Sequence, residues 1–122
     1  MIANKVFVGY DTREDIAYQV CEHSIWQHNK DIEVVPLKQQ ELRDNKLYWR
    51  GEDKLASTEF TFTRFLIPHL MNYEGWALFC DSDIVFLEDV DNLFSLRDDK
   101  YAVMCVQHDY TPKPGTKMDG QV

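Results

Sequence analysis

The 122-residue sequence has no hydrophobic run approaching the roughly 20 residues that a membrane-spanning helix needs. Its first residues contain only a short apolar segment that leads directly into Asp11, whereas a secretory signal peptide needs a longer apolar stretch. This start therefore predicts a first strand. We expect a protein without a signal peptide or a transmembrane segment.

Positive charge is also scarce. The chain has 13 Lys and Arg residues against 21 Asp and Glu residues, which gives a formal net charge of −8. Such a balance argues against general binding to nucleic acid or to an anionic membrane. It still permits a small anionic ligand, because a metal ion or a few local basic groups can override the overall field.

Cysteine is few and odd in number. Cys21, Cys80 and Cys105 are far apart in the sequence, and each stands in an apolar segment. This pattern predicts reduced, buried thiols and a cytoplasmic location. The length is close to the commonest size of one domain, so we expect a single domain over residues 1–122.

Strand and helix patterns alternate along the chain. The predicted strands are 5–10, 32–37, 76–80 and 101–107, and the predicted helices are 13–29 and 58–72, with a helical turn at 91–96. Pro68 is expected to kink the second helix, and the polar stretch 38–57 is either functional or contains a short helix of its own. Residues 76–80 lack polar alternation, which predicts a central strand.

This order predicts an α/β fold in which helices flank a mainly parallel sheet. In such sheets ligands bind at the carboxyl ends of the strands. Asp11 follows the first strand and Asp81 follows the third, so we expect both at that edge.

Asp81-Ser82-Asp83 directly follows five apolar residues and is the main candidate for chemistry. In extended backbone, residues i and i+2 point to the same side, roughly 6.6 Å apart. Two carboxylates so placed suit Mg²⁺ or Mn²⁺, with substrate oxygens and water completing the shell. The spacing alone equally permits a structural turn. A second pair, Asp89 and Asp91, lies in a polar stretch and is better explained as capping a helix.

Two linked motifs resemble the central pattern of glycosyltransferase family 8, whose members are GT-A enzymes that use nucleotide sugars. The first is Thr63-Arg64-Phe65-Leu66-Ile67-Pro68, and the second is Trp76-Ala77-Leu78-Phe79-Cys80-Asp81-Ser82-Asp83-Ile84. Val6-Phe7-Val8-Gly9-Tyr10-Asp11 also looks like the first strand of that family. The resemblance covers roughly residues 4–107 and is strongest over 57–90.

The resemblance implies a GT-A (Rossmann-like) fold and a role for each matching residue. Asp81 and Asp83 would hold Mn²⁺ or Mg²⁺, with Asp81 also near the ribose, and Arg64 would lie near the sugar diphosphate. Tyr10 would stack on the base, and Asp11 would accept a base N–H. The alternative for Arg64 is a charge on the surface of a helix, and the alternative for Tyr10 is ordinary packing at a strand end.

The sequence also departs from the family pattern. The family continues past the position where this sequence stops, adding an acceptor pocket and a histidine metal ligand, so we expect a domain incomplete at its C-terminus. His108 does not match that histidine motif and is better explained as a loop residue. A halved sheet leaves edges and apolar surface uncovered, which predicts self-association or a partner chain.

Three functions remain open at this point. The first is a metal-dependent glycosyltransferase that uses a nucleotide-diphosphate sugar, preferably a UDP-sugar, with an unknown acceptor. The second is a non-catalytic fragment or subunit that binds the nucleotide sugar and metal and needs a partner chain. The third, a phosphatase resembling the haloacid dehalogenases, fits poorly because the pair follows the third strand and position 85 is Val.

Overall fold

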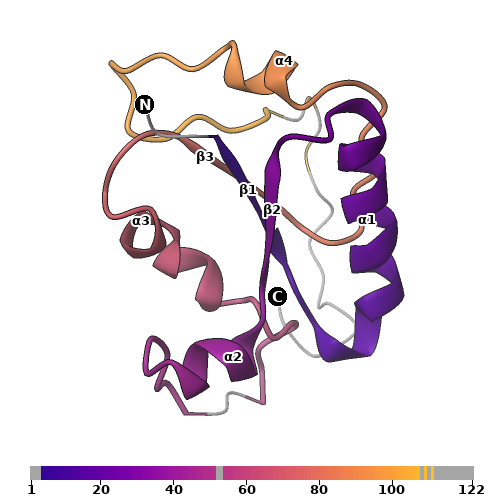
Figure 1. Cartoon of the computed structure of the whole chain (residues 1–122). Coiled ribbons are helices and arrows are strands. Elements are labelled where there is room, and N and C mark those ends of the chain that lie inside the picture. The colour runs from indigo at the N-terminus through magenta and orange to yellow at the C-terminus, as the bar shows by residue number, and fades with distance from the viewer. Residues whose placement is uncertain (1–3, 52–53, 108, 110, 112–122) are drawn as a thin grey trace.

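A three-stranded parallel sheet forms the centre of the molecule (Figure 1). The computed structural model describes residues 4–51, 54–107, 109 and 111. The strands are β1 (Lys5–Gly9), β2 (Glu33–Leu37) and β3 (Ala77–Cys80), in the spatial order β2-β1-β3. Both neighbours run parallel to β1, which confirms the predicted α/β class with a parallel sheet.

One longer helix, several short helices and two 3₁₀ turns flank the sheet. A 3₁₀ turn, Thr12–Glu14, leads into α1 (Asp15–His28), and α2 (Gln39–Asp44) follows β2. A second 3₁₀ turn, Thr63–Leu66, continues into α3 (Ile67–Leu70), and α4 (Asp91–Phe94) follows β3. The polar stretch after β2 therefore does contain a short helix. None of the described helices is long and apolar enough to span a bilayer.

Alternation along β1 directs its side chains to two separate cores. Val6 and Val8 are buried against α1, in a cluster that also contains Cys21 and Ile25. Phe7 points to the opposite face, where it packs with Leu37, Met71 and residues of α3. Figure 1 shows α1 and α3 on opposite sides of the sheet. Both faces of the central strand are thus covered, as parallel sheets require.

Three predictions about the elements were wrong or only partly right. Residues 101–107 form no strand, and they are exposed, because no neighbouring strand within the described residues pairs with them. β3 is an edge strand within this sheet rather than a central one, and its side chains are half-buried. Only 63–70 of the predicted helix 58–72 is helical, as a 3₁₀ turn followed by a short α-helix.

The sequence around Pro68 explains why the predicted helix 58–72 is shorter in the structure. Pro68 lies in the first turn of α3, where its missing N–H costs nothing, so it begins a helix instead of kinking one. The aromatic and β-branched residues before it have low helix propensity. Asn72 and Tyr73 then adopt positive φ angles of 54° and 58°, which end the helix.

The cysteines are free thiols, as predicted, but they differ in burial. Cys21 is buried, Cys80 is half-buried and Cys105 is exposed, so the prediction of three buried thiols was wrong for Cys105. The exposure of Cys105 follows from the missing strand at 101–107.

Candidate functional site

The carboxyl edge of the sheet gathers most of the predicted site residues. Gly9 pairs with Leu37 and Val8 pairs with Cys80, so the chain continues at this edge into Tyr10, Lys38 and Asp81. The Nζ atom of Lys38 lies 5.2 Å from the centroid of the Tyr10 ring. The predicted convergence of the first and third strand exits is therefore present.

Tyr10 is half-buried and held from several sides. Its hydroxyl donates a hydrogen bond to Asp15 in the first turn of α1, and its ring meets the Tyr18 ring edge-on at a centroid distance of 5.5 Å. The bond to Asp15 raises the pKa of Tyr10 and lowers the pKa of Asp15. The ring thus has a fixed orientation beside the cation of Lys38.

Asp11 is only 2% exposed, and its carboxylate is used within the chain. Oδ1 accepts the backbone N–H and the Nε–H of Arg13, both at 2.9 Å. Oδ2 accepts from Nη2 of Arg13 at 2.6 Å and from the backbone N–H of Glu59 at 3.2 Å. The guanidinium of Arg13 is the main reason that the pKa of Asp11 lies well below its usual range.

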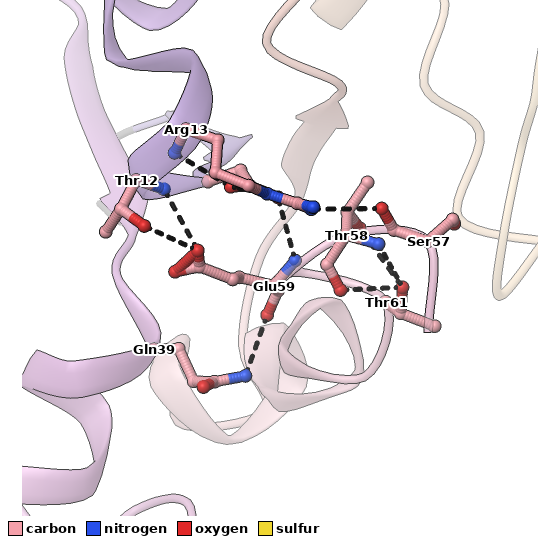
Figure 2. A network of polar contacts seen from close by, with 8 residues as sticks. Thr12, Arg13, Gln39, Ser57, Thr58, Glu59 and Thr61 are labelled. Carbon is pink, nitrogen blue, oxygen red and sulfur yellow. Dashed lines mark hydrogen bonds and ion pairs between the residues drawn. The ribbon is translucent and has the colours of Figure 1, made fainter. Parts of the chain in front are cut away.

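Glu59 connects this strand end to two other segments (Figure 2). Its carboxylate accepts the Thr12 hydroxyl at 2.7 Å and the Thr12 backbone N–H at 3.1 Å. Its backbone carbonyl accepts Nε2 of Gln39, on α2, at 3.1 Å. Arg13 adds a bond from Nη2 to the carbonyl of Ser57 at 3.2 Å. The segment 57–61 is thereby tied to the ends of β1 and β2.

Phe60 fills the space over the end of β1. A Cβ atom on Gly9 would lie 2.4 Å from the Phe60 ring, so this close approach requires glycine. The ring also packs against Phe79 of β3 at a centroid distance of 6.3 Å.

Arg64 lies over both of these rings. Its guanidinium carbon is 5.4 Å from the Phe60 centroid and 5.1 Å from the Phe79 centroid, and its Nε donates to the Phe60 carbonyl at 3.2 Å. No carboxylate among the described residues forms an ion pair with it. Phe79 precedes Asp81 by two positions, so the cation is next to the end of β3.

Asp81 and Asp83 are exposed, whereas Ser82 between them is 3% exposed. Within the described part of the chain, neither carboxylate has a hydrogen-bond or ion-pair partner. Both charges act on the half-buried thiol of Cys80, whose pKa is raised first by its contact with Cys21, then by burial, and further by these two carboxylates. The two carboxylates therefore occupy one small region at the end of β3.

The second Asp-Xaa-Asp pair serves α4. Asn29 donates from Nδ2 to Asp89 at 3.0 Å and to Asp91 at 3.1 Å, and Asp89 accepts the backbone N–H of Asp91 at the start of the helix. The carboxylates of Asp89 and Asp91 therefore have a structural role. Among the described residues the carboxylates of the first pair have no partner, and they offer the hard oxygen donors that Mg²⁺ and Mn²⁺ prefer.

A complete metal-binding set is not present in the part of the chain that the structure describes. No group of three or more His, Cys, Asp and Glu side chains there could hold an ion. His108, considered above as a further ligand, lies outside the described residues. The donors fit a metal that takes its other ligands from a substrate or from residues outside this set.

Sequence reasoning missed Arg13, Lys38, Glu59 and Phe60. Gly9 was a usable signal for Phe60, since glycine at a strand end often marks a close approach. No signal in the sequence pairs Glu59 with Thr12, because 47 residues separate them.

Comparison with known proteins agrees with the two motifs. The family model described as "Glycosyl transferase family 8" matches residues 15–119. The chain belongs to glycosyltransferase family 8. Protein CDI of Arabidopsis thaliana is 58% identical over 119 residues, which cover 97% of this chain and 46% of that protein. The chain thus spans about half the length of this curated relative. No solved structure matches the 122-residue chain significantly.

The family match covers some of the predicted site residues and not others. The matched range contains Arg64, Asp81 and Asp83, but it begins after Tyr10 and Asp11. The roles of these five residues stay predictions. The phosphatase interpretation is abandoned, because the family is not that of the haloacid dehalogenases.

Proposed function

We propose that this chain forms the nucleotide-sugar-binding half of a metal-dependent glycosyltransferase. The donor is a nucleotide-diphosphate sugar, preferably a UDP-sugar, and its diphosphate lies at the carboxyl end of β3. Family membership supports the transferase class. The finer assignment rests on the chemistry of this edge.

One observation carries the proposal. Within the described residues, two exposed carboxylates without partners directly follow β3, and a guanidinium without a carboxylate partner lies 5.1 Å from the centroid of the Phe79 ring of the same strand. Among the described residues, Asp81 and Asp83 have no partners, and Arg64 has no acidic one. Structural charges usually pair, as Asp11 and Arg13 do here. Charges left free at the ligand edge of a parallel sheet are suited to a ligand that carries both a metal ion and phosphate.

The residues divide the work. Asp83 and Asp81 would hold Mn²⁺ or Mg²⁺, which when bound offsets the diphosphate charge and polarises the leaving phosphate. Arg64 would orient a diphosphate oxygen through its guanidinium N–H groups while Phe60 and Phe79 hold its plane. Tyr10 would offer its ring to the base.

For Asp11 the predicted contact with a base N–H demands a change. Each of its oxygens already accepts two hydrogen bonds, and the side chain is buried. A carboxylate oxygen has two lone pairs, so the acceptor capacity of Asp11 is filled. In our proposal, Asp11 therefore holds the chain beneath Tyr10, and a base contact would require Arg13 to leave.

A binding-only fragment remains the second candidate. The observation that favours it is length, since the chain spans 46% of its curated relative. The two candidates share the donor site and differ in whether a labelled sugar is transferred or hydrolysed. That assay separates them once binding has been measured.

Calorimetric titration tests the donor site directly. We expect UDP or GDP to bind the 122-residue chain with Mn²⁺ present and to bind much more weakly without it. Asp83→Ala should weaken Mn²⁺-dependent binding at least about tenfold, the size of effect that even outer-shell changes cause at metal sites. The matched control is Asp91→Ala, which alters the other Asp-Xaa-Asp pair and should leave binding unchanged. Binding that ignores both Mn²⁺ and Asp83→Ala would refute the proposal.

A further inference from the structure

We propose that Glu59 is a positioning residue that sets the location of Arg64 at the donor edge. The assignment rests on the proposed function, since it concerns how the diphosphate-facing guanidinium is held. Glu59 contacts Asp11 through its backbone N–H, and we assign it no direct contact with the donor.

The first step is the attachment of Glu59 to the strand end. Its carboxylate accepts two hydrogen bonds from Thr12, at 2.7 and 3.1 Å, and its backbone N–H donates to Asp11 at 3.2 Å. Its carbonyl accepts from Gln39 at 3.1 Å. Figure 2 shows these bonds converging on one residue from the chain after β1 and from α2. A residue held by its side chain, N–H and carbonyl has little freedom to shift.

The second step is the transfer of this position to Arg64. Phe60 follows Glu59 directly, is 4% exposed, and fits over Gly9, where not even a methyl group has room. Its carbonyl accepts from Nε of Arg64 at 3.2 Å, and its ring lies under the guanidinium. The path from β1 to Arg64 therefore consists of one hydrogen-bonded residue and one tightly packed ring.

The third step is that Arg64 has few other supports among the described residues. Arg64 has no carboxylate partner there, and its half-buried side chain is held by Phe60 and Phe79 alone. Weak ring contacts leave a long side chain free among several rotamers. Without its bonds to Thr12, segment 57–61 keeps its bonds with Arg13, Asp11 and Gln39, and we expect it to hold Arg64 less firmly.

The experiment measures the position of Arg64 and nucleotide affinity separately. In the ¹⁵N-labelled chain, ring currents of Phe60 and Phe79 should move the NMR chemical shift of the Arg64 Nε–H away from that of an unstructured arginine. Glu59→Ala should move it toward the value of an unstructured arginine. Glu59→Gln, which still accepts a bond from Thr12, should restore most of the shift. This readout needs no nucleotide.

Affinity supplies the second readout through a double-mutant cycle. Glu59→Ala should weaken Mn²⁺-dependent UDP binding about tenfold, and it should have no further effect in an Arg64→Ala background, because contacts within one network are not additive. Additive losses, or an unmoved Arg64 signal in folded Glu59→Ala, would overturn the assignment.

Two outcomes keep the test decisive. If the unaltered chain binds no nucleotide, the proposed function fails, and the Arg64 signal alone then decides the positioning role. If Glu59→Ala does not fold, Thr12→Val removes the 2.7 Å bond at nearly constant shape and should shift the Arg64 signal in the same direction. An unshifted signal in Thr12→Val would then refute the role.

Discussion

Replacing Asp11 should show that this acidic residue stabilises the fold. Asp11→Ala removes four accepted hydrogen bonds, two of them from the guanidinium of Arg13, and it removes the side chain that caps the turn Thr12–Glu14. A lost cap costs about 1 kcal/mol. Bonds to charged groups contribute about 1.5–3 kcal/mol, and the exposed Arg13 side chain places them at the lower end.

We therefore expect Asp11→Ala to lower the free energy of unfolding by about 2–4 kcal/mol. That is a large part of the roughly 5–15 kcal/mol that stabilises a domain. Thermal unfolding should shift down by about 10 °C for a chain of this size. Urea denaturation followed by circular dichroism measures both the midpoint and the slope. A loss below about 0.5 kcal/mol, the usual size of a surface effect, would refute the reasoning.

The Asp11 carboxylate should also make the free energy of unfolding depend on pH. Arg13 lowers the pKa of Asp11 in the folded chain below the unfolded value of about 3.9. Its stabilisation is therefore fully present above about pH 5 and is lost as the pH falls through 4 toward the folded pKa. The stability difference between the unaltered chain and Asp11→Asn should narrow between pH 7 and pH 2.5. The control is the same substitution in an Arg13→Ala background, where the narrowing should be smaller because the guanidinium that lowers the pKa of Asp11 is absent. A difference that stays constant with pH would contradict the role of Arg13.

Two further predictions follow from packing and exposure. Gly9→Ala should destabilise the fold by about 1–3 kcal/mol, since its methyl group meets the Phe60 ring; Phe60→Ala in the same chain should recover part of that loss, and simple additivity would contradict the clash. The exposed apolar side chains of Phe65, Leu87 and Val106 should make the 122-residue chain self-associate. Sedimentation velocity across a concentration series tests this, and a monomer at every concentration would contradict it.

The sheet was predictable because its strands are read from local patterns. Residues 5–9, 33–37 and 77–80 are short apolar runs bounded by polar or turn residues, and their parallel order follows from the intervening segments. The positions of these strands within the sheet could not be predicted from the same patterns. An apolar run without alternation predicts burial on both faces, which β1 fulfils, while β3 has the same pattern at the edge.

Only the charged residues of the candidate site could be predicted from the sequence. Asp81, Asp83 and Arg64 stand in motifs that a reader of sequences can find, whereas their support comes from long-range contacts. Glu59 reaches Thr12 across 47 positions, and nothing in the local sequence distinguishes it from the other glutamates. Helix 58–72 was overestimated for a related reason: tertiary bonds hold the segment 57–61 in turns that its sequence spacing does not reveal.

The two kinds of carboxylate at this edge explain why a metal ion belongs to the proposed mechanism. Asp11 is buried, paired with Arg13 and hydrogen-bonded on both oxygens, so its charge is already balanced within the fold. Asp81 and Asp83 are exposed and, among the described residues, balanced by nothing. In a chain of net charge −8, two such carboxylates would repel a diphosphate, and the single guanidinium of Arg64 cannot neutralise both. A divalent cation held by Asp81 and Asp83 would attract the diphosphate and so offset this repulsion. We therefore expect the Mn²⁺ dependence of nucleotide binding to weaken in Asp83→Ala and to persist in Arg64→Ala, because only the carboxylates create the need for the ion.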